Sequence, residues 1–263
     1  MSEGVSASSL SLFIKNPYLF YEQKILGIDN KDESKYLNYM DQGTLIHRVI
    51  EKLYKPFIGK TLDANDVNLM KNQLQNESLN TFIELYSREP RGKNLIFIEV
   101  VKEYIQNTLN FELDQINNQN AKIKMISLEK KLEYNLTINN QNVKLKGIID
   151  RIDMLNDEVR IIDYKSGNVN SGVLDIRNID KVKIDHKYSY LLQLLFYKYL
   201  FGMNNVNIHV KEIGICSVKK RNLPFQFIKN QAILSLEEIQ MIISDIIIDI
   251  MHTNEFIDSG NPL

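Results

Sequence analysis

Cysteine is almost absent from this sequence of 263 residues, which contains only Cys216. A single thiol cannot form an internal disulfide bond, and it cannot supply a metal or iron–sulfur site made of cysteines alone. The start of the chain, MSEGVSASSL, lacks the basic and then apolar pattern of a secretion signal. Both features predict a protein of the reducing cytoplasm.

Long apolar runs are also missing. No stretch approaches the roughly 18 consecutive apolar residues that a membrane-spanning helix needs, so we expect no membrane association. The composition is 44% hydrophobic and 25% charged, which is ordinary for a globular chain and sufficient for a sizeable core. The phosphate-binding pattern G-x-x-x-x-G-K-[ST] does not occur either, and ATP use by this chain is therefore not expected.

The sequence has no excess of either charge, since its formal net charge is -1. This value neither supports nor excludes a nucleic-acid partner, because phosphate binding depends on local basic surfaces. Two such groups are Lys181, Lys183 and Lys187 around His186, and Lys219, Lys220 and Arg221. Each group is compatible with a solvated loop and with a DNA contact, and both interpretations stay open.

Two periodicities divide the chain. Residues 1–120 show mainly helical spacing, with helices expected at 8–26 (broken at Pro17), 41–57, 63–88 and 94–118. Residues 121–263 begin with alternation, and the predicted strands are 122–138, 142–154, 158–165, 206–217 and 223–229, with helices at 188–201 and 236–251. We expect a helical N-terminal region and an α/β (α+β) core with a mixed sheet, folded together as one domain.

The predicted hairpin in the middle of the chain brings charged residues together. A two-residue turn at Asn156-Asp157 places Asp150 directly opposite Asp163, and Asp153 opposite Arg160. The two pairs point to opposite faces of the hairpin, so Asp153 and Arg160 can form an ordinary ion pair. A change of one residue in the turn would destroy this register.

Two carboxylates side by side repel each other unless a positive charge lies between them. Mg²⁺ suits such a site, because it prefers oxygen ligands and keeps waters, one of which can act as a nucleophile. Lys165 lies two residues after Asp163 and points to the same face. It can stabilise charge on a phosphate or help to orient and deprotonate the water. An isolated D-x-K is, however, more often a structural pair.

Four short motifs change this balance. In chain order they are GTLIH (residues 43–47), GIIDRID (147–153), DYKSG (163–167) and QLLFY (193–197). They resemble the G-x-x-x-H, G-x-x-D-R-I-D, D-Y-K-x-G and Q-x-x-x-Y motifs of the RecB-like branch of the PD-(D/E)XK nucleases. Each motif alone is weak, but the four together in this order are highly specific. The resemblance implies a restriction-endonuclease-like core and Mg²⁺-dependent cleavage of DNA, with Mn²⁺ as a substitute.

The resemblance also implies roles for individual residues. His47, Asp150 and Asp163 would bind the metal together with the backbone carbonyl of Tyr164, and Lys165 would be the catalytic lysine. The supporting or DNA-contacting residues would be Gln193 and Tyr197, with Tyr190 on the same helix stripe. Core packing is the alternative for both tyrosines. Glu129 could be an accessory acid, but we rank it below a solvent-facing glutamate.

The opening segment, VSASSLSLFIKNPYLFYEQKILGI, resembles the start of the nuclease domain in AddB-type helicase–nucleases. Many of those proteins carry an iron–sulfur cluster with a cysteine before the proline, whereas this chain has Asn16 before Pro17. We therefore predict no cluster. The resemblance implies a nuclease domain that acts in double-strand-break repair, with a helicase subunit or helicase domain as partner. The alternatives are a stand-alone exonuclease, of the phage or CRISPR-associated type, and a non-catalytic DNA-binding module on a decayed nuclease fold.

Overall fold

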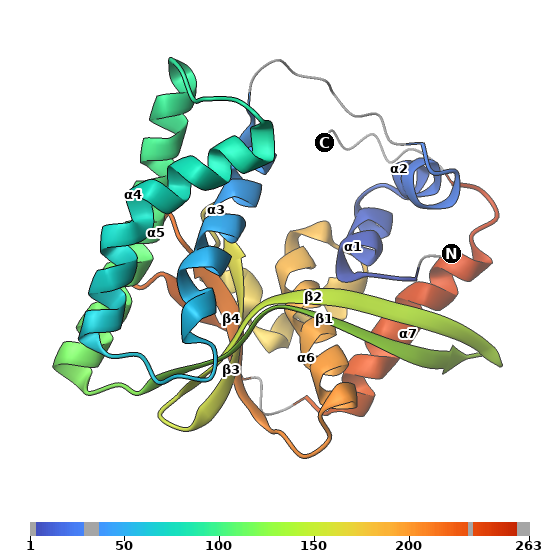
Figure 1. Ribbon diagram of the computed structural model, residues 1–263. Helices are drawn as coiled ribbons and strands as arrows, with labels where there is room; N and C mark the ends of the chain where they lie inside the picture. Colours follow the sequence, from blue (N-terminus) through green and yellow to red (C-terminus); the bar gives the residue numbers. More distant parts are fainter. Residues whose placement is uncertain (1–3, 29–36, 231–233, 257–263) are drawn as a thin grey trace.

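The computed structural model describes residues 4–28, 37–230 and 234–256, so parts of the two predicted regions, including 1–3 and 257–263, lie outside the described residues. The helices are α1 (Ala7–Lys15), α2 (Pro17–Phe20), α3 (Tyr39–Tyr54), α4 (Ala64–Tyr86), α5 (Lys93–Gln119), α6 (Ser189–Asn204) and α7 (Leu236–His252) (Figure 1). The strands are β1 (Ile123–Ile138), β2 (Gln141–Leu155), β3 (Glu158–Lys165), β4 (Val210–Ser217) and β5 (Phe225–Phe227).

Local sequence signals define where the helices begin. Helices α1, α3, α4 and α7 start at capping boxes, in which the first side chain and a residue three positions later satisfy each other's backbone N–H groups. The pairs are Ser6 with Ser9, Asn38 with Asp41, Asp63 with Asp66, and Ser235 with Glu238. The predicted break at Pro17 is confirmed, since Asn16 ends α1 and caps α2 by accepting a hydrogen bond from the backbone N–H of Leu19.

The five strands form one mixed sheet in the order β1-β2-β3-β4-β5. Strands β3 and β4 are parallel and the other neighbours are antiparallel. Two-residue turns at Asn139-Asn140 and Asn156-Asp157 join the first three strands, and all four turn residues have positive φ values. The first turn is one residue shorter than predicted, because Gln141 already pairs with Ile138. Strands β4 and β5 are also shorter than predicted.

Helices cover both faces of the sheet, which confirms the predicted α/β architecture. On one face α1, α6 and α7 form a core with sheet residues such as Ile149 and Ile161. On the other face α3, α4 and α5 form a second core that includes Ile162 and Tyr164 (Figure 1). Both cores combine residues from before and after residue 120. Among the described residues, no helix is both long and apolar enough to cross a membrane.

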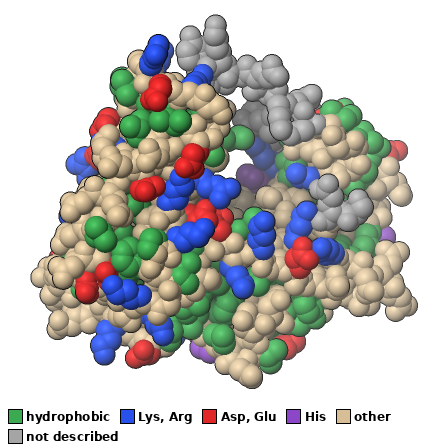
Figure 2. Space-filling view, in the orientation of Figure 1, with side chains coloured by type: hydrophobic (Ala, Val, Ile, Leu, Met, Phe, Trp, Pro, Cys, Tyr) green, Lys and Arg blue, Asp and Glu red, His purple; other side chains and the backbone are tan. Residues whose placement is uncertain are grey.

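Strands β3 and β4 end together, with Lys165 of β3 beside Ser217 of β4. In Figure 1, α3 and α1 both lie above the β1–β2 ribbon, α3 toward its left end and α1 further to the right. In the space-filling view a hollow separates the parts of the molecule that carry α3 and α1, and Lys and Arg side chains gather near it (Figure 2). The predicted site residues lie on α3, β2, β3 and α6.

Candidate metal centre

The hairpin of β2 and β3 has the predicted register. Asp153 pairs with Arg160, and Arg151 pairs with Ile162, so Asp150 and Asp163 follow in the same register. The two aspartates are buried, with exposed fractions of 7% and 2%. Asp150 Oδ2 accepts a hydrogen bond of 2.7 Å from the backbone N–H of Tyr164, which holds its carboxylate beside the end of β3.

His47 reaches this place from α3. Its Nε2 lies 3.0 Å from the backbone oxygen of Tyr164. Because a carbonyl can only accept, Nε2 must carry the hydrogen in this contact. The other ring nitrogen, Nδ1, faces two carboxylates, at 3.5 Å from Asp150 Oδ1 and 3.9 Å from Glu129 Oε1. The backbone of Tyr164 thus holds both His47 and Asp150, because its carbonyl oxygen accepts from His47 and its N–H donates to Asp150.

Glu129 is the residue that we ranked too low from the sequence. Leu128 pairs with Arg151 and Lys130 pairs with Ile149, so Glu129 stands at the register position opposite Asp150. The signal was present in the sequence: a two-residue turn at Asn139-Asn140 gives this register, whereas the three-residue turn that we predicted does not. The backbone of Glu129 has a φ of 46°, a left-handed conformation that non-glycine residues seldom adopt and that often marks a functional site.

His47, Glu129 and Asp150 can each offer one ligand atom, and these atoms all lie within 4.8 Å of one another. Burial disfavours the charged imidazolium of His47, but the hydrogen-bonding carboxylates of Asp150 and Glu129 outweigh it and raise the pKa of His47 to about 10. The protonated imidazole of His47 therefore supplies positive charge beside the carboxylates of Asp150 and Glu129, and a metal cation could supply that charge instead. One imidazole with two carboxylates is a donor set that suits a divalent metal ion.

Asp163 lies beside this cluster and has its own partners. Its Oδ2 is 2.7 Å from Lys165 Nζ, and its Oδ1 accepts a hydrogen bond of 3.1 Å from Gln193 of α6. Burial, followed by the negative charge of Asp150, raises the pKa of Asp163 to about 6 although Lys165 opposes the shift. Burial lowers and Asp163 raises the pKa of Lys165, and the net shift is upward. Lys165 is therefore a cation here.

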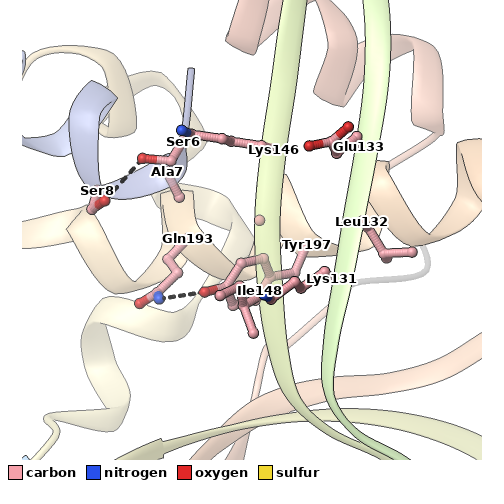
Figure 3. A pocket seen from close by; sticks show the side chains of 11 residues that line it. Ser6, Ala7, Ser8, Lys131, Leu132, Glu133, Lys146, Ile148, Gln193 and Tyr197 are labelled. Atoms are coloured by element: carbon pink, nitrogen blue, oxygen red, sulfur yellow. Dashed lines mark hydrogen bonds between the residues drawn. The ribbon is translucent and has the colours of Figure 1, made fainter. Parts of the chain in front are cut away.

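The predicted motif of Gln193 and Tyr197 lies on α6, and Gln193 reaches the site through its hydrogen bond to Asp163. Gln193 also donates a hydrogen bond of 2.9 Å to the hydroxyl of Tyr197, as Figure 3 shows. Tyr197 is buried, and burial raises its pKa. Tyr190 is half-buried, and its ring centroid lies 5.5 Å from Lys165 Nζ. The roles of these three side chains toward a substrate stay predictions.

A buried charge network lies on the opposite face of the same strands. Arg151 Nη1 donates to Glu112 of α5 (2.6 Å) and to the hydroxyl of Tyr164 (3.1 Å). The hydroxyl of Tyr54, on α3, donates to the other oxygen of Glu112. Asp153 binds Arg151 and also Arg160, the predicted ion pair. Glu112 thereby connects the helix of His47 with the residue next to Asp150.

The two basic groups found in the sequence are partly neutralised. Lys183 pairs with Asp245 at 2.7 Å, and Arg221 pairs with Glu103. Lys220 donates to the backbone oxygen of Val169 at 3.0 Å. These contacts favour the interpretation of a solvated surface for the three side chains.

Comparison with known proteins supports the resemblance. The model of the PD-(D/E)XK nuclease superfamily matches residues 4–247. An uncharacterized protein of Rickettsia conorii is 29% identical over 175 residues, which cover 63% of this chain and 19% of the relative. A subunit of the ATP-dependent helicase/deoxyribonuclease of Streptococcus agalactiae is 29% identical over 163 residues, which cover 62% of this chain and 14% of the relative.

The chain thus spans less than a fifth of the length of these curated relatives. Among solved structures, that of SSO0001 has a TM-score of 0.32 and 15% identity, and the match covers 83% of this chain and 89% of the other. A TM-score this low carries no weight, whereas the superfamily match extends over nearly the whole described chain. The chain belongs to the PD-(D/E)XK nuclease superfamily.

Proposed function

We propose that the chain is a metal-dependent deoxyribonuclease that hydrolyses phosphodiester bonds. One observation carries the proposal: in a chain of a nuclease superfamily, an imidazole and two carboxylates gather within 4.8 Å beside an Asp163–Lys165 pair. The proposed ion is Mg²⁺, for which Mn²⁺ would substitute, and no iron–sulfur cluster takes part.

The proposed ligands are His47, Asp150 and Glu129, with Asp163 and the Tyr164 carbonyl beside them. A bound divalent ion supplies a Lewis acid for a phosphate oxygen and lowers the pKa of a bound water. The chain's own groups prepare this place. The backbone N–H and carbonyl of Tyr164 orient Asp150 and His47, and Gln193 holds Asp163.

Lys165 would stabilise negative charge on the attacked phosphate. Its pKa is raised and its partner Asp163 lies 2.7 Å away, so the ammonium form is favoured. A lysine in this form acts as a fixed positive charge and is a poor base. This favours the charge-stabilising role over the deprotonation of water.

The streptococcal relatives suggest the larger context. They are ATP-dependent helicase/deoxyribonuclease subunits, and this chain corresponds to about a seventh of their length (14%). We propose that the chain is the exonuclease domain of a helicase–nuclease in double-strand-break repair and recombination, with DNA as substrate and a helicase as partner. The cytoplasm is the proposed location.

The experiment that tests this function is cleavage of linear and circular DNA, single- and double-stranded, in Mg²⁺, Mn²⁺ or EDTA. We expect cleavage in both metals, none in EDTA, and none by Lys165→Ala or Asp163→Ala. Resistance of circles would support an exonuclease. Wild-type protein that binds metal but cuts no substrate would contradict an autonomous nuclease and favour the non-catalytic module or a requirement for the helicase partner.

A further inference from the structure

A second feature of the molecule lies beside the candidate metal centre, next to α1. It is a cavity of about 400 Å³ between α1, the turn before α6, and the first turns of α6. Lys165 and Gln193, which contact Asp163, also line it. We call it the α1 cavity, and its other polar lining residues are Ser8, Ser11, Lys15, His186, Ser189 and Tyr190.

The α1 cavity is lined by two lysines, a histidine and hydroxyl groups. Lys15 lies in the last turn of α1 and His186 in the turn that precedes α6. Burial, and then the positive charge of Lys15, lower the pKa of His186, although Asp185 opposes the shift. The charge of Lys15 thus acts on His186, and an anion in the cavity would favour the charged form of His186. Among the described residues that line the cavity, none is a carboxylate.

A neighbouring cavity of about 430 Å³ offers a contrast. It is the one drawn in Figure 3, and it shares Ser8 and Gln193 with the α1 cavity. Its lining includes the carboxylate of Glu133, which pairs with Lys144 at 2.7 Å. Its two lysines, Lys131 and Lys146, thus share the lining with a carboxylate, whereas the lysines of the α1 cavity do not.

The α1 cavity also has the right place relative to the reaction centre. Lys165, the group that we propose at the attacked phosphate, lines the same cavity as Lys15 and His186. A nucleic-acid strand carries one phosphate per nucleotide, so a strand with one phosphate at Lys165 can place the next one among Lys15, His186 and the hydroxyls. Side-chain hydroxyls and lysines are common phosphate contacts.

We propose that the α1 cavity, through Lys15, His186 and the hydroxyls of Ser8, Ser11 and Ser189, binds the phosphate that neighbours the attacked one on the same strand. This inference rests on the proposed function. The ligand class is a nucleotide phosphate, either an internal diester or a terminal monoester. The subsite reads no base and sets the position of the strand.

The test is the binding of a short fluorescent oligothymidylate to the full chain, measured by anisotropy in Ca²⁺ over a range of salt concentrations. We expect Lys15→Ala to weaken binding roughly tenfold and to reduce the slope of log affinity against log salt by about one, the signature of one lost phosphate contact. Lys15→Arg should restore both values. The matched control is Lys211→Ala, because Lys211 pairs with Glu158 at the opposite end of β3 and β4, and it should bind like the wild type.

The outcomes separate this inference from the proposed function. If Lys15→Ala binds with wild-type affinity and slope while the wild type cleaves DNA, the subsite is wrong and the nuclease stands. The subsite is equally wrong if Lys211→Ala loses as much affinity as Lys15→Ala. If the wild type neither binds the oligonucleotide nor cleaves DNA, both proposals fail.

The same assay distinguishes the two sources of phosphate. Oligonucleotides with and without a 5′- or 3′-phosphate are compared in the wild type and in Lys15→Ala. If a terminal monoester occupies the cavity, its removal weakens binding to the wild type and has no further effect in Lys15→Ala. If an internal diester occupies it, Lys15→Ala weakens binding to all the oligonucleotides by the same factor.

Discussion

At the scale of single residues, the centre depends on how the backbone of one residue, Tyr164, presents its N–H and its carbonyl oxygen. The Tyr164 carbonyl accepts from His47, and the Tyr164 N–H donates to Asp150. These contacts fix the two side chains before any ligand arrives. Glu129 completes the set from the neighbouring strand with a backbone in the left-handed region. A non-glycine residue in the left-handed region costs free energy that the surrounding structure must offset. A functional role of the Glu129 carboxylate is a physical reason to retain this conformation.

Replacement of Glu129 by Gln removes the charge and keeps the size. We expect Glu129→Gln to weaken Mn²⁺ binding by roughly tenfold or more, because a carboxylate is a better ligand for a hard cation than an amide. Isothermal titration calorimetry measures the change. Glu158→Gln is the control, since Glu158 pairs with Lys211 far from the cluster. Equal Mn²⁺ affinity in the two variants would exclude Glu129 as a ligand.

The titration of the site predicts how metal affinity depends on pH. The proton on His47, whose pKa is about 10, must leave before its ring nitrogen can bind the ion, and loss of the proton from Asp163, whose pKa is about 6, adds negative charge beside the ligands. Mn²⁺ affinity should therefore rise as the pH increases from the pKa of Asp163 toward that of His47. Proton release on Mn²⁺ binding, measured by calorimetry in buffers of different ionisation enthalpy, checks the sign. Affinity that falls with rising pH would contradict it.

At the scale of helices and strands, the buried network around Glu112 ties α3 and α5 to β2 and β3. Tyr54 and His47 lie on the same helix, so the bonds from Tyr54 and Arg151 to Glu112 help to hold that helix at the end of β3. Both charged partners, Arg151 and Glu112, have 0% exposed side chains. If Glu112 loses its charge, Arg151 and Arg160 share the single carboxylate of Asp153, and one buried positive charge is left uncompensated, which is costly.

Glu112→Gln should therefore destabilise the chain by about 3 kcal/mol. Urea unfolding followed by circular dichroism gives the difference in unfolding free energy. Glu99→Gln on the same helix is the control, because Glu99 is exposed and pairs with Lys102 within one turn. That variant should change stability by less than about 0.5 kcal/mol. Similar losses in both variants would show that the network has no special role.

Gly147 and Gly43, each in one of the sequence motifs, differ in how much room their surroundings leave for a side chain. A Cβ on Gly147 of β2 would lie 3.0 Å from Leu200 Cδ1 and 3.3 Å from Tyr197 Cε1, so its absence lets α6 approach the sheet. A Cβ on Gly43 of α3 would meet Ser166 Oγ at an ordinary 3.7 Å.

Gly147→Val should destabilise the chain by about 2 kcal/mol through overpacking and should displace Tyr197. Gly43→Ala, by contrast, should stabilise α3 by about 0.5–1 kcal/mol, because alanine loses less backbone entropy in a helix. Thermal unfolding and the tyrosine signals in near-UV circular dichroism report both effects. A tolerated Gly147→Val would contradict the packing argument.

At the scale of the whole molecule, one sheet serves two cores. Neighbouring residues of β3, Ile161 and Ile162, point into different cores. Helices α1, α6 and α7 pack in the core of Ile161, and α3, α4 and α5 pack in the core of Ile162. Neither core can form without the sheet. The described helical region before residue 120 is therefore built into the same unit as the strands.

This arrangement predicts a single cooperative unfolding transition. Scanning calorimetry should give equal calorimetric and van't Hoff enthalpies, as for one two-state unit. Addition of Mn²⁺ should move the transition to higher temperature, because an ion that binds only the folded state stabilises it. Two resolved transitions would show instead that the α3–α5 core and the α1–α6–α7 core unfold separately.

Much of the fold was determined by the sequence itself. Helical spacing, capping residues and the break at Pro17 identify the helices, because these signals act within one turn of backbone. The two-residue turn at Asn156-Asp157 determines which residues of β2 and β3 face each other, and with them the position of Asp150 relative to Asp163. The motifs identify the superfamily because their order and spacing are specific.

Only the tertiary structure decided the rest. Glu129 joins His47 and Asp150 because a third strand aligns with β2, and an error of one residue in the predicted turn was enough to hide this register. The bond from His47 to Tyr164 spans 117 residues of sequence, and the α1 cavity forms where α1 and α6 meet. The last two contacts depend on packing of the whole sheet and its helices, and no local pattern in the sequence encodes them.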